Sequence, residues 1–362
     1  MLAFVQRRIE RRIAALGIAA AFGLCLLALP APTAAKGIAA WGKIAGWTAP
    51  TQIDATREMS SVWCAPSTGA TWSTFCIAVD TDGYALTFDG HTGSWSTPVK
   101  IDPLGLSSVS CAPSTLDTLS AFCVAVNALG IVTYTHGTWS APASQAVIVH
   151  DVACASTSFC VAIGDAGFQG DALLYAGGVW KPIWIRRKES RGRLTAVSCA
   201  SVTFCAAVGT GGRATIYSNG SWSTPSRIDG YQGSQLDLMS VSCPSSTYCV
   251  AVDEIGRALT FDGSSWSQPV AMKIVHAGGP ASIACPATRI CIVVYQSGEL
   301  LALGGTLSHS AWSDLGMLDS EGFEPLGPSL SCPSAAFCAG VDARGGWVFH
   351  PASLVSMPTP PG

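Results

Sequence analysis

The stretch Ser240-Val-Ser-Cys-Pro-Ser-Ser-Thr-Tyr-Cys-Val-Ala-Val-Asp253 contains the unit that this chain repeats. It is followed by a Gly, a short apolar segment and Gly-Ser-Ser-Trp266-Ser-Gln-Pro269. Related blocks occur along most of the 362 residues. Self-similarity at a fixed period is typical of repeat architectures, in which each unit is one supersecondary structure that packs on its neighbours.

The cysteines give the period of the repeat. Successive first cysteines of each pair lie 47, 43, 45, 44, 42 and 47 residues apart. A period of 40 to 50 residues is typical of β-propeller blades. The seven pairs are Cys64 with Cys76, Cys111 with Cys123, Cys154 with Cys160, Cys199 with Cys205, Cys243 with Cys249, Cys285 with Cys291, and Cys332 with Cys338.

Each unit reads as four short β-strands. The first ends at the first Cys, the second begins at the second Cys, the third is the apolar segment, and the fourth starts at the repeated Trp. Alternating apolar and polar residues favour half-buried strands, and Gly and Asp supply the turns between them. The sequence therefore predicts an all-β, seven-bladed propeller over residues 41–350, with four-stranded blades.

The two ends of the repeat region complement each other. The last unit, residues 329–350, lacks a Trp-Ser-x-Pro segment, whereas Trp47-Thr-Ala-Pro50 precedes the first unit and is similar to Trp95-Ser-Thr-Pro98. We expect this N-terminal segment to complete the last blade as its outer strand and to close the ring, which removes exposed strand edges. The repeat tryptophans are then also seven: Trp47, Trp95, Trp139, Trp180, Trp222, Trp266 and Trp312.

The repeated side chains each allow two interpretations. The Cys pairs could bind metal, but no His is in register and no Cys-x2-Cys occurs, so we predict seven structural disulfides and no metal site. The tryptophans could stack on ligands, but their presence in every blade favours packing between blades. The Asp that ends the second strand, as in Asp80, Asp253 and Asp342, could bind calcium, but a turn-capping role is favoured.

Residues 1–35 have the order of a secretory signal peptide. Four arginines precede a run of about 17 apolar residues, which ends at Pro30 before the small residues Thr33-Ala-Ala35. A retained membrane anchor is the alternative, because 17 residues is near the lower limit for a spanning helix. Cleavage removes Cys25 and leaves 14 cysteines, an even number typical of a secreted disulfide framework. The Pro-rich tail, residues 351–362, is predicted to be disordered.

The charge balance argues against nucleic acid as a partner. The formal net charge is −3, and removal of the first 35 residues leaves 16 basic and 22 acidic residues. No global basic field is present to attract a phosphate backbone. We expect a secreted, extracytoplasmic monomer that contacts a membrane only if the N-terminal segment is retained.

Two irregular connections stand out from the repeat. Residues 181–193 hold six of those 16 basic residues, and residues 314–324 hold four acids. Function is expected where a repeat is violated. The basic segment could bind an anionic partner, or it could be a solvated insertion. The candidate binding residues are Trp184, Arg186, Arg187, Lys188, Arg191 and Arg193.

No catalytic motif emerges from the chain. The six His recur at no repeat position, and Gly-x-Ser-x-Gly, His-Glu-x-x-His and phosphate-loop motifs are absent. The catalytic residues are therefore unknown, and no cofactor is predicted.

The repeat Ser-Val-Ser-Cys-Pro-Ser-x-x-x-Cys-Val-Ala-Val-Asp with Gly-Ser-Ser-Trp-Ser resembles the cysteine-bearing repeats of propellers secreted by actinobacteria. It is distantly similar to photosystem-assembly-factor-like and sialidase-type propellers, although the sialidase Asp-box spacing is not met. The resemblance covers about residues 41–350 and implies a fold without implying an activity.

The sequence thus favours a secreted or cell-envelope binding or scaffold protein. Its variable loops would bind a glycan, a cell-wall polymer or an envelope protein. The alternative is a hydrolase or lyase that acts on polysaccharide, for which converging carboxylates at the channel mouth would be evidence.

Overall fold

The structure is a computed structural model. It describes residues 53, 57–65, 75–90, 92–113, 120–145, 147–165, 171–185, 193–230, 236–272, 278–305, 312–317, 327–335, 337–343 and 345–349. The chain divides into Met1–Ala40 and Trp41–Gly362, and every described residue belongs to the second unit. The predicted signal peptide and Pro-rich tail lie outside the described residues. Among the residues described, no helix is long and apolar enough to cross a membrane.

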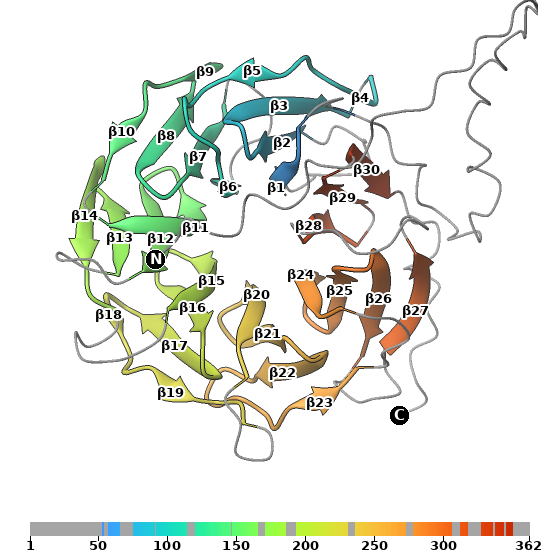
Figure 1. Ribbon diagram of the computed structural model, residues 1–362. Helices are drawn as coiled ribbons and strands as arrows, with labels where there is room; N and C mark the ends of the chain where they lie inside the picture. Colours follow the sequence, from blue (N-terminus) through green and yellow to red (C-terminus); the bar gives the residue numbers. More distant parts are fainter. Residues whose placement is uncertain are drawn as a thin grey trace, which may run out of the picture. The chain divides into compact units, whose positions relative to one another are not determined.

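The described strands form seven antiparallel sheets, one for each predicted repeat (Figure 1). Blade 1 holds β1 (Met59–Cys64), β2 (Phe75–Asp80), β3 (Tyr84–Asp89), β4 (Ser94–Trp95) and β5 (Val99–Lys100). Blade 2 holds β6 (Ser108–Cys111), β7 (Phe122–Val126), β8 (Gly130–Thr135), β9 (Thr138–Trp139) and β10 (Ala143–Ser144). Blade 3 holds β11 (Ile148–Ser156), β12 (Phe159–Asp165), β13 (Ala172–Ala176) and β14 (Val179–Ile183).

The second half of the ring repeats this plan. Blade 4 holds β15 (Leu194–Ser201), β16 (Phe204–Gly209), β17 (Arg213–Ser218), β18 (Ser221–Trp222) and β19 (Ser226–Arg227). Blade 5 holds β20 (Leu238–Ser245), β21 (Tyr248–Asp253), β22 (Arg257–Phe261) and β23 (Val270–Ala271). Blade 6 holds β24 (Pro280–Ala287), β25 (Ile290–Tyr295), β26 (Glu299–Gly304) and β27 (Trp312–Met317). Blade 7 holds β28 (Ser329–Ser334), β29 (Phe337–Asp342) and β30 (Gly345–Phe349).

The sheets close into a ring. The inner strands contact one another in the order β1, β6, β11, β15, β20, β24 and β28, and β28 contacts β1 again. Apolar clusters lie between consecutive blades, as where Val250 and Val252 of blade 5 pack with Val293 of blade 6. The prediction of an all-β, seven-bladed propeller is confirmed.

The predicted closing strand, residues 47–54, lies outside the described residues except for Ile53. The Ile53 side chain packs against the apolar cluster shared by blades 7 and 1. It also lies beside β30, since a Cβ placed on Gly346 would be 2.8 Å from Ile53 Cδ1.

The fourth strand differs from its predicted form in several blades. In blades 1, 2 and 4 the outer strand is split into two dipeptides at Trp-Ser-x-Pro. In blade 1, Ser96 N donates to the Thr87 carbonyl (2.8 Å), and Thr87 N donates to Ser96 Oγ (3.0 Å). The hydroxyl thus takes the place of a backbone carbonyl, and Pro98, which has no N–H, follows where the strand is interrupted. Equivalent bonds are made by Ser140, Ser223 and Ser267.

All seven predicted disulfides are present, and each joins the first two strands of one blade. They link Cys64 to Cys76, Cys111 to Cys123, Cys154 to Cys160, Cys199 to Cys205, Cys243 to Cys249, Cys285 to Cys291, and Cys332 to Cys338. Every predicted pairing is therefore confirmed.

The geometry of the strands explains the pairing of the cysteines. The bridged Cα atoms lie 3.9–4.1 Å apart in all seven blades. In blades 1 to 4 the two cysteines are directly opposed in the strand register. Seven bridges indicate an oxidising, extracytoplasmic environment, because cytosolic thiols are kept reduced.

The repeat tryptophans pack against the apolar clusters between blades, as predicted. Trp180, for example, lies 5.1 Å from Tyr175, which stacks at 5.6 Å on Phe122 of the preceding blade (ring centroids). The same packing holds for Trp95, Trp139, Trp222, Trp266 and Trp312. Trp47 lies outside the described residues.

The Asp that ends the second strand caps the following turn, as predicted. Asp80 Oδ1 accepts from the backbone N–H groups of Asp82 (3.0 Å) and Tyr84 (2.7 Å). Asp253 and Asn127 cap their turns in the same way.

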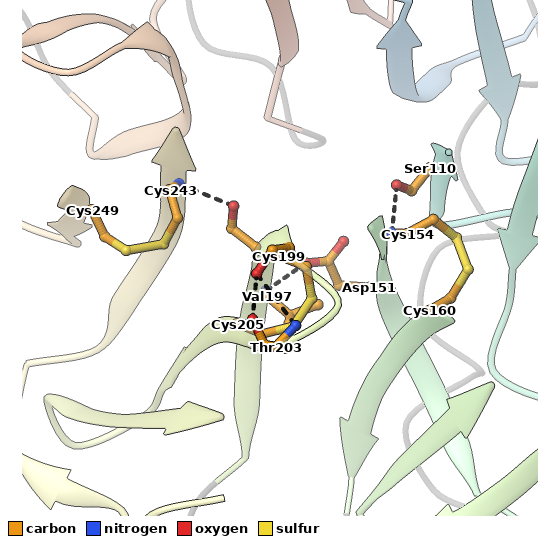
Figure 2. The surroundings of a disulfide bond; sticks show 12 residues. Ser110, Asp151, Cys154, Cys160, Val197, Cys199, Thr203, Cys205, Cys243 and Cys249 are labelled. Carbon is orange, nitrogen blue, oxygen red and sulfur yellow. Dashed lines mark hydrogen bonds between the residues drawn. A yellow bond between two sulfur atoms is a disulfide. The ribbon is translucent and has the colours of Figure 1, made fainter. Parts of the chain in front are cut away.

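The serines of Ser-Val-Ser-Cys join consecutive blades. The inner strand of each blade is a sheet edge, so the N–H groups on its free side need acceptors. The first serine accepts from the N–H of the residue two before the first Cys of the next blade, as when Val109 N donates to Ser61 Oγ (3.2 Å). The second serine accepts from the N–H of the next blade's first Cys, as when Cys154 N donates to Ser110 Oγ (3.0 Å, Figure 2). We call these contacts the hydroxyl ring.

Some blades lack a serine at one of the two positions. The second position is occupied by Trp63, Ala153 and Ala284, and the first by Ala196 and Asp151. The carboxylate of Asp151 replaces the hydroxyl and accepts from Val197 N (2.8 Å). The side chain of Ala153, in contrast, has no oxygen that could accept from Cys199 N.

Exchange of serine and alanine at the second position tests the hydroxyl ring. We expect Ser198→Ala to lower the free energy of unfolding by about 1–2 kcal/mol, because Cys243 N loses its acceptor (3.0 Å). We expect Ala153→Ser to raise it by about 0.5–1 kcal/mol, because a hydroxyl there can accept from Cys199 N. Chemical denaturation of the oxidised variants measures both. Changes of the same sign in the free energy of unfolding of the two variants would contradict this role.

Candidate functional site

One face of the ring carries the variable connections. Successive connections of an antiparallel blade alternate between its two ends, so the loops from strand two to strand three share a face with those that lead into the next blade. We call this the loop face. The opposite face, which carries the disulfide-bridged turns and the turns between strands three and four, is the turn face.

Two of the predicted binding residues are described, and both lie on the loop face. Trp184 follows β14, and 39% of its surface is exposed. Arg193 immediately precedes β15 and is also exposed. The chain between them is fixed at its start, because Ile185 is buried and its N–H donates to Asp171 Oδ1 (2.7 Å). Four predicted residues lie outside the described residues: Arg186, Arg187, Lys188 and Arg191.

Arg193 is held by neighbouring polar groups. Its Nε lies 3.4 Å from Asp165 Oδ1, and its Nη2 lies 3.4 Å from His150 Nε2. The pKa of His150 is lowered, first by burial and then by the Arg193 charge, although Asp165 opposes the shift. Arg193 therefore supplies a positive charge in a fixed position at the loop face.

The structure corrects the bounds of both irregular connections. The sequence places Lys181 in the basic connection, but the residue lies in β14 and pairs with Leu174. The sequence likewise places Asp314 in the acidic connection, but the residue lies in β27, where its Oδ1 accepts from Gly316 N (2.7 Å). Both outer strands continue past the repeat Trp, so the loops are shorter than predicted.

The loop face also carries most of the exposed apolar surface. Eight large hydrophobic residues are exposed among those described, and five lie in loops or at strand ends of this face. We call these five the apolar loop set: Leu104, Leu129, Ile148, Trp184 and Ile255, which are 39–58% exposed. The five side chains come from separate connections around the ring, so only a partner that spans several blades would cover them together.

Cationic side chains accompany the apolar loop set. Arg57 and Lys100 both lie over the Tyr84 ring, at 3.8 and 4.8 Å from its centroid. Tyr84 begins β3 at the loop face, and Arg57 also approaches Asp82 (3.8 Å). These two cations are on blade 1, whereas Arg193 begins blade 4.

A buried ion-pair network supports the loop that carries Ile255. Arg257 Nε lies 2.5 Å from Asp253 Oδ2, and an Arg257 terminal nitrogen lies 2.5 Å from Asp229 Oδ1. Asp229 comes from blade 4, so the network joins two blades. Asp253 Oδ1 also accepts from Ile255 N (3.1 Å), which fixes the loop on which this apolar side chain is presented.

The central channel has a volume of about 350 Å³ and is lined by the inner strands of all seven blades. Its one lining carboxylate, within the described ranges, is Asp151. Asp151 Oδ1 accepts from Ser108 Oγ (2.7 Å) and Val152 N (2.9 Å), and Oδ2 accepts from Val197 N. Figure 2 shows the carboxylate between blades 3 and 4. Burial raises its pKa to about 6, although these three hydrogen bonds favour the charged form.

Asp151 acts as an inter-blade acceptor in this geometry. Both oxygens are engaged in contacts that join blades 2, 3 and 4. No pair of converging carboxylates, which the enzyme alternative called for, lines the channel in the part of the chain that the structure describes. Within the same residues, no group of three or more His, Cys, Asp or Glu could hold a metal ion.

Sequence reasoning missed Asp151 and the apolar loop set. Alignment of the repeats contains the signal for Asp151, because its position holds Ser or Ala in every other blade. The apolar loop set gives no such signal, since its members occupy different repeat positions and share a face only in the closed ring.

Comparison with known proteins shows the fold alone. No family model matches this chain, and no curated protein matches it. Among solved structures, it is similar to YCF48 bound to D1 peptide, with a TM-score of 0.59 and 12% identity over 84% of this chain and 97% of that chain. It is also similar to U3-55K, with a TM-score of 0.62 and 9% identity over 84% of this chain and 98% of that chain. Membership of the secreted actinobacterial propellers stays a prediction.

Replacement of Asp151 by Ser tests the cause of its raised pKa. A carboxyl whose pKa is about 6 in the folded state and about 4 when unfolded stabilises the fold fully below pH 4, and this contribution is lost as pH rises through 6. A shift of two pKa units corresponds to about 3 kcal/mol. We expect Asp151→Ser to remove this fall in stability, because a hydroxyl accepts from Val197 N without ionising.

The measurement is the unfolding free energy of both proteins between pH 4 and 7. Ala196→Ser, which adds a hydroxyl at the same repeat position in blade 4, is the matched control and should leave the pH dependence unchanged. Parallel curves for the wild type and Asp151→Ser would show that the carboxyl titrates normally.

Proposed function

We propose that this protein is an extracytoplasmic binding scaffold that holds a partner protein on its loop face. The observation that carries the proposal is the apolar loop set, since five of the eight large exposed hydrophobic residues described belong to this one face. When a partner surface covers exposed apolar side chains, their removal from water contributes favourably to the free energy of binding.

The charges indicate the chemistry of the partner surface. Arg57, Lys100 and Arg193 accompany the apolar side chains, and the sequence adds four further basic residues between Trp184 and Arg193. Arg57 and Arg193 already lie beside Asp82 and Asp165, so Lys100 and the basic residues of the sequence are the charges that favour a partner with carboxylates among its apolar side chains. Such an arrangement speeds association and makes it sensitive to salt.

A protein fits the described surface better than the two other predicted ligands. An anionic glycan or cell-wall polymer would use the cations and Trp184, but it would leave Leu104, Leu129 and Ile148 in water. These three aliphatic side chains are 44–58% exposed. A folded protein surface can cover them and also approach the cations.

The rigid base of the loops supports a scaffold role. The Asp229–Arg257–Asp253 network and the turn-capping Asp80 hold strand ends from which the loops start, while the disulfides and the hydroxyl ring hold the sheets beneath them. A partner therefore meets side chains whose backbone is largely fixed before binding, which lowers the entropic cost of association.

Export of the chain and closure of the ring by the N-terminal strand belong to the same proposal. We propose that residues 1–35 direct export and are removed, in line with the seven disulfides. We also propose that residues 47–54 complete blade 7. The contact of Ile53 with Gly346 in β30 supports that strand.

The test compares retention of extracytoplasmic proteins by two immobilised variants. One carries Leu129→Ser, Ile148→Ser and Trp184→Ala on the loop face. The matched control carries Val179→Ser and Val202→Ser, which remove exposed hydrophobic residues that lie away from it. We expect one defined protein to bind the wild type and the control, and to bind the loop-face variant at least tenfold more weakly in purified form.

Equal binding by the two variants would place the partner site elsewhere. Retention of purified cell-wall polymer, with loss in the loop-face variant and in high salt, would replace the protein partner by an anionic polymer. Circular dichroism and thermal unfolding of each variant show whether the fold is kept.

A further inference from the structure

A groove between blades 4 and 5 runs along their outer strands from the turn face and lies apart from the channel. Its volume is about 850 Å³, which is within the range of about 300–1,000 Å³ typical of small-molecule sites. Its walls include the turn at Asn219 in blade 4 and the turns at Thr247 and Ser264 in blade 5. All three belong to the turn face.

Neutral polar side chains make up more than half of the lining of the groove. Nine Ser or Thr residues, one Asn and one Gln line it, and none of its described lining residues is a carboxylate. Arg227 is the one charged lining residue, and its Nε donates to the Asp229 carbonyl (2.9 Å). Such a surface offers many hydrogen bonds with little net charge.

An apolar strip runs along the bottom of the groove. Phe204 of blade 4 and Phe261 of blade 5 lie 5.9 Å apart between ring centroids, and Trp266 lies 5.4 Å from Phe261. The two phenylalanines are buried, whereas Trp266 is half-buried and lines the groove. An indole surface is thus available beside the hydroxyl groups.

The walls of the groove are held in place by the repeat itself. Ser223 N donates to the Ile216 carbonyl (2.8 Å), and Ile216 N donates to Ser223 Oγ (3.0 Å). Ser267 makes the same two bonds with Thr260 in blade 5. The groove is therefore formed before a ligand arrives.

We propose that this groove binds a neutral oligosaccharide. Sugar rings have hydroxyl edges that exchange hydrogen bonds with Ser, Thr, Asn and Gln, and C–H faces that pack on an indole. The near absence of charge disfavours cationic and anionic ligands alike. The volume of about 850 Å³ leaves room for more than one sugar ring, which favours a chain of sugars over a single one.

The experiment is isothermal titration of the oxidised protein with cellohexaose, xylohexaose, maltohexaose and chitohexaose. We expect at least one of these neutral probes to bind with a Kd below about 1 mM, and the Kd to be unchanged between about 50 and 500 mM NaCl. Trp266→Ala should weaken binding at least tenfold, and Gln268→Ala together with Asn219→Ala should weaken it at least threefold.

Matched variants distinguish a specific groove from general sugar adhesion. Trp139→Ala removes the equivalent tryptophan of blade 2 and should leave the Kd unchanged. The double variant of Gln268 and Asn219, which changes only side chains on the rim, keeps the test valid if Trp266→Ala does not fold. The proposal would be overturned if none of the four probes binds at millimolar concentration, or if the Trp266 and Trp139 variants lose binding equally. Neither result bears on the loop face.

Discussion

The structure depends on how the inner edge of each blade satisfies its backbone N–H groups. Seven inner strands surround the channel, and each leaves one side without a strand partner. The serines of Ser-Val-Ser-Cys provide acceptors from the preceding blade, as Ser110 does for Cys154. The same bond closes the ring between its ends, because Cys64 N donates to Ser331 Oγ (2.9 Å) over 267 residues of sequence. Each blade is therefore joined to the next by hydrogen bonds as well as by apolar packing.

This arrangement explains why the repeat is so regular in the strands and so variable in the loops. The disulfide, the serines, the Trp-Ser-x-Pro interruption and the capping Asp all serve contacts within or between blades. Of these four features, only the capping Asp reaches the loop face, where it fixes the turn between the second and third strands. The loops of this face are free to carry side chains such as Leu129 and Trp184, which the fold itself does not require to be apolar.

The sequence predicted the fold because its strongest signals are local and repeated. The cysteine spacing defines the blades, and the seven disulfides follow from opposed strand positions. The interruption of the outer strand could not be predicted from alternation, because it depends on Ser96 and its equivalents replacing a carbonyl with a hydroxyl. Lys181 and Asp314 were misplaced for a related reason, since their outer strands lack the full Trp-Ser-x-Pro and continue farther.

The candidate site was less accessible to sequence reasoning. Trp184 and Arg193 were recognised because they break the repeat, and both lie on the loop face. Leu104, Leu129, Ile148 and Ile255 look ordinary along the chain, and only the closed ring brings them to one face. Asp151 could be found by aligning blades, but its part in joining three of them depends on the geometry of the neighbouring inner strands.

Amide hydrogen exchange of the inner strands tests the hydroxyl ring most directly. In four blades the N–H of the first cysteine donates to a serine hydroxyl of the preceding blade: Cys64, Cys154, Cys243 and Cys285. In the other three, Cys111, Cys199 and Cys332, the equivalent position of the preceding blade holds Trp63, Ala153 or Ala284, which has no side-chain oxygen. The account predicts that the first four amides exchange at least tenfold more slowly than the other three in the native protein. Indistinguishable rates in the two groups would contradict it, because the hydroxyls would then not be the acceptors that hold the blades together.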